Sequence, residues 1–78
     1  MNDEQIREHL MSSNPEFYRL VEEHQNFEQR LHDLQTHHHM TEQDLLEEAV
    51  LKKKKLQTKD KINLMMNQLR TELSHQAI

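Results

Sequence analysis

The sequence contains no glycine, no cysteine and only one proline among its 78 residues. Folds made of strands and tight turns depend on glycine and proline at their turns, so this scarcity argues against them. The absence of cysteine excludes disulfide bonds and thiolate metal sites. We therefore predict an all-α protein in which long helices are joined by polar connections.

Long apolar runs are missing as well. No segment approaches the roughly 18 to 20 apolar residues that cross a bilayer, and the acidic start, Met1 to Glu4, is unlike a secretory signal. We expect a cytoplasmic protein with no membrane contact.

Charged residues are nearly as common as apolar ones, but the net charge is only −4 and the apolar residues are regularly spaced, which argues against disorder.

No pattern in the chain is typical of an enzyme. There is no glycine-rich phosphate loop and no cysteine nucleophile, and a chain this short has little core in which to build a pocket that excludes water. We therefore expect no catalytic residues and no cofactor.

The chain divides at Asn14 and Pro15 into a short N-terminal helix with its connection (residues 1–13) and a helical hairpin (residues 14–78). Ile6 and Leu10, four residues apart, give the first helix one apolar edge. Asn14 is suited to cap the next helix, and Pro15 fits a first helical position. We predict a helix over about 15–36.

That helix carries apolar residues and histidines at alternating steps of three and four, which is the spacing of a coiled-coil seam. A turn over about 37–41 follows. Thr41 and Asp44 then resemble a capping box at the start of a third helix over about 42–73. Two stripes of this helix compete to face the hairpin, one through Leu45, Ala49, Leu56 and Met66 and the other through Leu51, Ile62, Met65 and Leu69.

A short connection makes the two long helices antiparallel, coiled-coil-like neighbours. Folding at residues 38 and 39 sets Leu31 near Leu46 and Phe27 near Val50. The same register sets Arg30 near Glu47, and Glu22 near Lys55. The predicted hairpin seam consists of Phe17, Leu20, His24, Phe27, Leu31, Leu34, Leu46 and Val50.

The third helix is longer than the second, so an apolar end projects past Pro15. The candidate interface there consists of Met65, Met66, Leu69 and Leu73. Either the short N-terminal helix covers these side chains through Ile6 and Leu10, or another molecule does. We predict a homo-oligomer, with a dimer first, and consider docking on a protein partner.

Two motifs suggest other classes of protein. Lysines between Lys52 and Lys61 suggest binding of nucleic acid or another anion, but four consecutive helical lysines cannot share one face and no aromatic residue lies among them. His37, His38 and His39 suggest a metal-responsive protein, but neighbouring loop residues converge poorly on one ion. Both remain minor alternatives to a structural or interaction module.

The stretch from Asn14 to about Gln68 resembles the YdcH-like family, small bacterial proteins containing a domain of unknown function. The resemblance rests on Pro15-Glu16-Phe17, on Arg19-Leu20-Val21-Glu22-Glu23-His24, and on Leu51-Lys52-Lys53-Lys54-Lys55-Leu56-Gln57-Thr58-Lys59-Asp60-Lys61-Ile62. It implies a bacterial, cytoplasmic helical hairpin with no established activity. The His37–His39 tract and the residues after Gln68 depart from the family's pattern.

Overall fold

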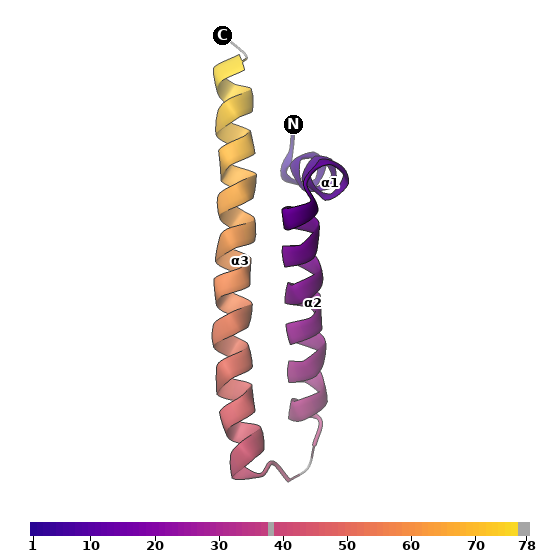
Figure 1. Cartoon of the computed structure of the whole chain (residues 1–78), viewed down its shortest axis with the longest axis vertical. Coiled ribbons are helices and arrows are strands. Elements are labelled where there is room, and N and C mark those ends of the chain that lie inside the picture. Colours follow the sequence, from indigo (N-terminus) through magenta and orange to yellow (C-terminus); the bar gives the residue numbers. More distant parts are fainter. Residues whose placement is uncertain (38, 77–78) are drawn as a thin grey trace.

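The computed structural model describes residues 1–37 and 39–76, and these contain three α-helices and no strand. The helices are α1 (Asp3–Ser13), α2 (Pro15–Gln35) and α3 (Glu42–Gln76). Figure 1 shows α2 and α3 side by side above the bend that joins them, with α1 turned across the far end of α2. The molecule is elongated, measuring 57 × 19 × 17 Å. The predicted all-α class and the hairpin arrangement are confirmed.

Asn14 both ends α1 and begins α2. A residue before proline is pushed out of the helical region, and Asn14 is accordingly extended, with φ −126° and ψ 104°. Its backbone N–H donates to the Leu10 carbonyl at 2.9 Å, while its side-chain oxygen accepts from the Phe17 N–H at 3.1 Å. One residue therefore satisfies a terminal carbonyl of one helix and a free N–H of the next.

The other two helix starts are closed by reciprocal side-chain bonds. Asn2 accepts from the Gln5 N–H at 2.8 Å, and the Gln5 side chain accepts from the Asn2 N–H at 3.0 Å. Thr41 and Asp44 exchange the same pair of bonds, each at 3.1 Å, at the start of α3. The capping box predicted at Thr41 is therefore present, and it fixes where α3 begins.

The main core lies where α1 crosses the hairpin. Its buried residues come from all three helices and include Phe17, which is fully buried; they are Ile6, Leu10, Phe17, Leu20, Val21 and Ile62. The candidate interface residues of α3, namely Met65, Met66, Leu69 and Leu73, are partly buried and pack against this cluster. Of the two predicted coverings, the structure therefore has the first one, the short N-terminal helix.

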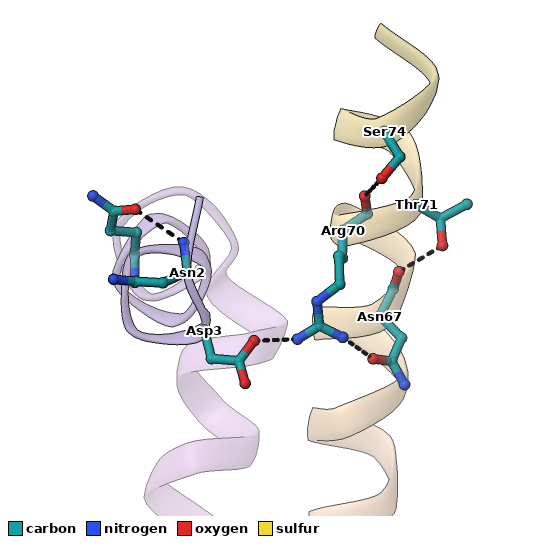
Figure 2. A network of polar contacts seen from close by, with 7 residues as sticks. Asn2, Asp3, Asn67, Arg70, Thr71 and Ser74 are labelled. Carbon is teal, nitrogen blue, oxygen red and sulfur yellow. Dashed lines mark hydrogen bonds and ion pairs between the residues drawn. The ribbon is translucent and has the colours of Figure 1, made fainter. Parts of the chain in front are cut away.

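A polar contact joins α1 to α3 beside this core. The Arg70 guanidinium donates to the Asp3 carboxylate and to the side chain of Asn67, as Figure 2 shows. Because Asp3 and Arg70 are both exposed, the ion pair between them adds little to stability on its own. It orients α1 over the end of α3.

Within residues 1–37 and 39–76 no helix is both long enough and apolar enough to span a bilayer.

Candidate interaction surface

The face that α3 turns toward the hairpin follows alternating steps of four and three residues. It includes Leu51, Thr58 and Ile62, of which the last two are buried. Closer to the bend the same face carries charged side chains that are only partly exposed, Asp44, Glu48 and Lys55. The inner face of α3 is thus apolar toward α1 and largely polar toward the bend.

Ion pairs hold α3 to α2 on this polar part. The Arg30 guanidinium donates two hydrogen bonds to the Glu47 carboxylate, at 2.7 and 3.0 Å. These bonds, and then the attraction of the opposite charges, raise the pKa of Arg30; the same bonds from Arg30 lower the pKa of Glu47 against a smaller effect of desolvation. The predicted pairing of Arg30 with Glu47 is confirmed. Two parallel bonds fix the height of α3 along α2.

The other flank of the hairpin carries a looser pair. Lys55 Nζ lies 3.6 Å from the Glu28 carboxylate, so the predicted pairing of Lys55 with Glu22 is wrong. Glu28 lies six residues nearer the bend than Glu22, where a long lysine side chain reaches it. Thr58, the one buried polar residue among those described, donates to the Lys54 carbonyl at 2.8 Å and so leaves no unsatisfied hydroxyl.

The residues of the predicted hairpin seam differ in burial between α2 and α3. Phe17, Leu20, Leu31 and Leu34 are buried, and His24 and Phe27 are partly buried. Leu46 and Val50, predicted opposite Leu31 and Phe27, are instead 69% and 51% exposed. The length of the bend sets the height of each α3 residue along α2, but it does not set how α3 is rotated about its own axis. Glu47 turns inward, so its neighbour Leu46 points about 100° away.

This rotation leaves a set of apolar side chains of α3 outside the contact with α2. We define the outer face by its five exposed apolar residues in the first half of the helix: Leu45, Leu46, Ala49, Val50 and Leu56. Leu64 is also exposed on this side, about two turns beyond Leu56. Near the bend, therefore, α3 presents acidic and basic residues to its own hairpin and leucines to the surroundings.

Part of the outer face could have been found in the sequence. One of the two competing stripes runs through Leu45, Ala49 and Leu56, which the structure places outside. The sequence pattern that indicates this face is a second row of residues spaced alternately by four and three positions. The row runs through Glu42, Leu46, Ala49, Lys53 and Leu56. It repeats at heptad spacing although the hairpin does not use it.

A shallow groove of about 380 Å³ lies between α2 and α3 beside the outer face. Its apolar wall includes Leu31 and Leu56, and its rim carries His32, Lys55 and Lys59. The groove extends the apolar surface of α3 toward α2. It is too open to exclude water from a reacting group.

His24 lies on the seam between the helices, partly buried. Its Nδ1 lies 3.7 Å from the Glu28 carboxylate. Its Nε2 is buried and has no hydrogen-bond partner among the described residues. A buried polar atom without a partner lowers stability, so His24 weakens the middle of the seam rather than forming a binding site there.

The two motifs that suggested other classes of protein are not brought together into sites. Lys52 pairs with Glu48 at 3.3 Å, one turn earlier in the same helix. Of the histidine tract, His37 Nδ1 lies 2.6 Å from the Asp33 carbonyl at the end of α2, His39 is exposed, and His38 lies outside the described residues. Among the residues that are described, no three histidine or carboxylate side chains are grouped to hold a metal ion.

Comparison with models of known protein families gives a match. A family model described as a protein of unknown function (DUF465) matches residues 17–66, which is more than half of the chain. The matched part contains nearly all of α2, the bend and the first two thirds of α3, and leaves out α1. Neither the curated proteins nor the solved structures contain a significant match.

Proposed function

This chain belongs to the DUF465 family of proteins of unknown function, which includes the YdcH-like family, and we propose that it is a non-catalytic helical hairpin that associates with other copies of itself. The outer face of α3 is the surface through which it would associate. The match over residues 17–66 includes the whole of this face. The part of the chain that carries the proposal is therefore the part that carries the family pattern.

One observation supports the proposal above the others: near the bend, the apolar side of α3 points away from the hairpin. A helix in a monomeric hairpin ordinarily turns its apolar stripe toward its neighbour and its charges toward water. Here Glu47 and Lys55 pair with α2 while Leu46 and Val50 are exposed. A contiguous apolar patch of this kind is typical of a protein interaction site.

The outer face offers enough apolar surface for a reversible dimer. Each of its leucines or valines is about half exposed, so burying it again contributes roughly 1 kcal/mol, half of the 1.5 to 3 kcal/mol for a full side chain. Three such residues, Leu45, Leu46 and Val50, on each of two copies contribute about 6 kcal/mol. Association costs on the order of 4 to 15 kcal/mol in lost motion. We therefore expect weak, concentration-dependent association rather than a permanent dimer.

The inner contact of the hairpin would be of the coiled-coil kind. The alternating steps of four and three along α3, facing a similar alternation on α2, are the spacing at which side chains of one helix enter the gaps of the other. The outer face repeats this spacing on the opposite side. In the proposed assembly α3 would thus be the central helix, with α2 on one side and a second copy on the other.

No catalysis is part of the proposal. The groove beside the outer face is open, and two of its charged residues, Glu28 and Lys55, pair with each other. Neither Zn²⁺ nor nucleic acid is proposed as a ligand. Lys52, Lys55 and Lys59 line the groove together, but Lys52 pairs with Glu48 and Lys55 with Glu28. Among the described residues, no three histidine or carboxylate side chains are grouped to hold a metal ion. A protein other than a second copy is a possible occupant of the outer face, and the experiment below separates the two.

Sedimentation velocity tests the proposal over protein concentrations from about 10 to 500 µM, since mass action moves a weak equilibrium across that range. We expect the average mass to rise with concentration toward that of a dimer. Leu46→Gln should suppress the rise. Leu64→Gln is the matched control, because Leu64 is also a leucine of α3 and is 57% exposed, but lies beyond the outer face.

Two results would contradict self-association. The first is a constant monomer mass over the whole range. The second is an equal effect of Leu46→Gln and Leu64→Gln, which would mean that association does not depend on the outer face. A constant monomer that nonetheless binds one purified protein through Leu46 would assign the face to a foreign partner.

A further inference from the structure

We propose that the second copy packs its α3 against α3 of the first, running in the opposite direction, in a register that sets Glu42 of each copy opposite Lys53 of the other. This inference rests on the proposed function, because it assumes that the outer face binds a second copy. It adds the relative direction of the two α3 helices, their register, and the charged residues that determine both.

The spacing of the outer residues supports this register. Glu42, Leu46, Ala49 and Lys53 follow one another at steps of four, three and four, so they lie in one row along the outer side of α3. In the proposed antiparallel register, the numbers of two facing residues, one from each copy, add up to 95. Leu46 of one copy then faces Ala49 of the other. Leu45 faces Val50 at the edge of the same contact. A large side chain then always meets a smaller one, which suits close packing.

The charges at the two ends of the row are complementary only when the two α3 helices run in opposite directions. Glu42 and Lys53 are both exposed, and neither forms an ion pair within the part of the chain that the structure describes. A parallel pair would set Glu42 against Glu42 and Lys53 against Lys53. An antiparallel pair sets each acid against a base, twice over, and like charges oppose the wrong arrangement.

Neighbouring registers are worse. A shift by seven residues toward the C-terminus brings Leu46 opposite Leu56, but it also brings Glu42 opposite Asp60 of the second copy, two acids, and Ala49 opposite Lys53. A shift by seven in the other direction brings Leu46 opposite Glu42. Of the registers that keep the heptad rows in contact, the proposed one alone matches both its apolar and its charged residues. The occupant is therefore argued from self-complementarity, which an unrelated helix would not require.

Charge reversal tests the inference. We compare the dimer dissociation constants of the unaltered chain, of Glu42→Lys, of Lys53→Glu and of the variant with both changes, by sedimentation at low salt, where such pairs act most strongly. Each single reversal creates two like-charge contacts and should weaken the dimer about tenfold. The double variant restores both opposite-charge pairs, so its dissociation constant should return to within about threefold of the original.

Asp60→Lys is the control for register. Asp60 lies on the same side of α3 as Lys53 but beyond the proposed overlap, so its reversal should leave the dissociation constant unchanged. If Asp60→Lys strengthens the dimer, the register shifted by seven residues is correct and ours is wrong. Circular dichroism of each variant checks that helix content is kept, since a lysine at position 42 is less favourable in the first turn of a helix.

The two proposals fail in different ways. A dimer that is weakened by Leu46→Gln, yet shows no recovery in the double charge variant, overturns the register and leaves the proposed function standing. A chain that does not associate at any concentration overturns both.

Discussion

Replacing Ile6 by alanine tests whether α1 is a structural part of the hairpin or a loosely attached segment. Ile6 is 1% exposed and belongs to the cluster against which Met65, Met66 and Leu69 pack. Removing three methyl or methylene groups from such a position leaves a cavity that the surrounding helices fill only in part. Buried isoleucine-to-alanine changes cost about 2 to 5 kcal/mol.

This loss is large compared with the stability of the whole chain. At about 0.05 to 0.15 kcal/mol per residue, 78 residues give roughly 4 to 12 kcal/mol in total. In urea, where a chain of this size loses about 1 kcal/mol per molar, the unfolding midpoint should fall by about 2 M or more. The assay is urea unfolding followed by the circular dichroism of the helices, at a protein concentration too low for association.

Leu64→Ala supplies the comparison, because Leu64 is a large aliphatic residue that lies 57% exposed on the same helix that Ile6 covers. The urea midpoint of Leu64→Ala should fall by only a small fraction of the fall expected for Ile6→Ala. If the two variants shift alike, α1 does not pack on α3 in solution. The apolar end of α3 would then be free for another molecule to cover, which is the second of the two coverings considered from the sequence.

Three further outcomes are expected. Asn14→Ala should destabilise the chain by about 1 kcal/mol in the same urea assay, since the α2 cap at Phe17 is lost; an unchanged midpoint would argue against the cap. His24→Leu should raise the midpoint, because a buried nitrogen without a partner is replaced by an apolar side chain; a fall would show that the imidazole is bonded in solution. In Arg30→Gln, NMR titration should find the pKa of Glu47 higher than in the unaltered chain. Since folding lowers this pKa, the ion pair stabilises the protein at pH values above the usual glutamate pKa, and this effect is lost as the pH falls through the lowered pKa. Arg30→Gln should therefore lower the urea midpoint at neutral pH but not at strongly acidic pH. Equal losses at both pH values would refute the assignment.

The helix starts could be predicted because their causes are local. Asn14 and Thr41 each accept from an N–H group three residues away, and Pro15 forces its neighbour into extended backbone, so a few letters of sequence contain all that is needed. The pairing of Arg30 with Glu47 was also predictable, since the length of the bend sets the height of one helix against the other.

The rotation of α3 was not predictable in the same way. Apolar residues occur on two sides of this helix, and the local pattern does not say which side meets α2. The choice depends on contacts far apart in sequence: Ile62 joins Ile6 and Phe17 in one core, and that requires Leu46 and Val50 to point outward. Only the assembled three helices determine the outer face.

The position of α1 has a consequence for any larger particle that this protein forms. The cap made by α1 and the last turns of α3 closes the end of the rod that lies farthest from the bend, whereas the outer face lies beside the bend. In the proposed pair only about three turns of each α3 overlap, so two rods of 57 Å would extend in opposite directions to a length of roughly 90 to 100 Å. The N-terminal helices would then lie near its two ends, beside the last turns of α3, where anything they carry is held apart.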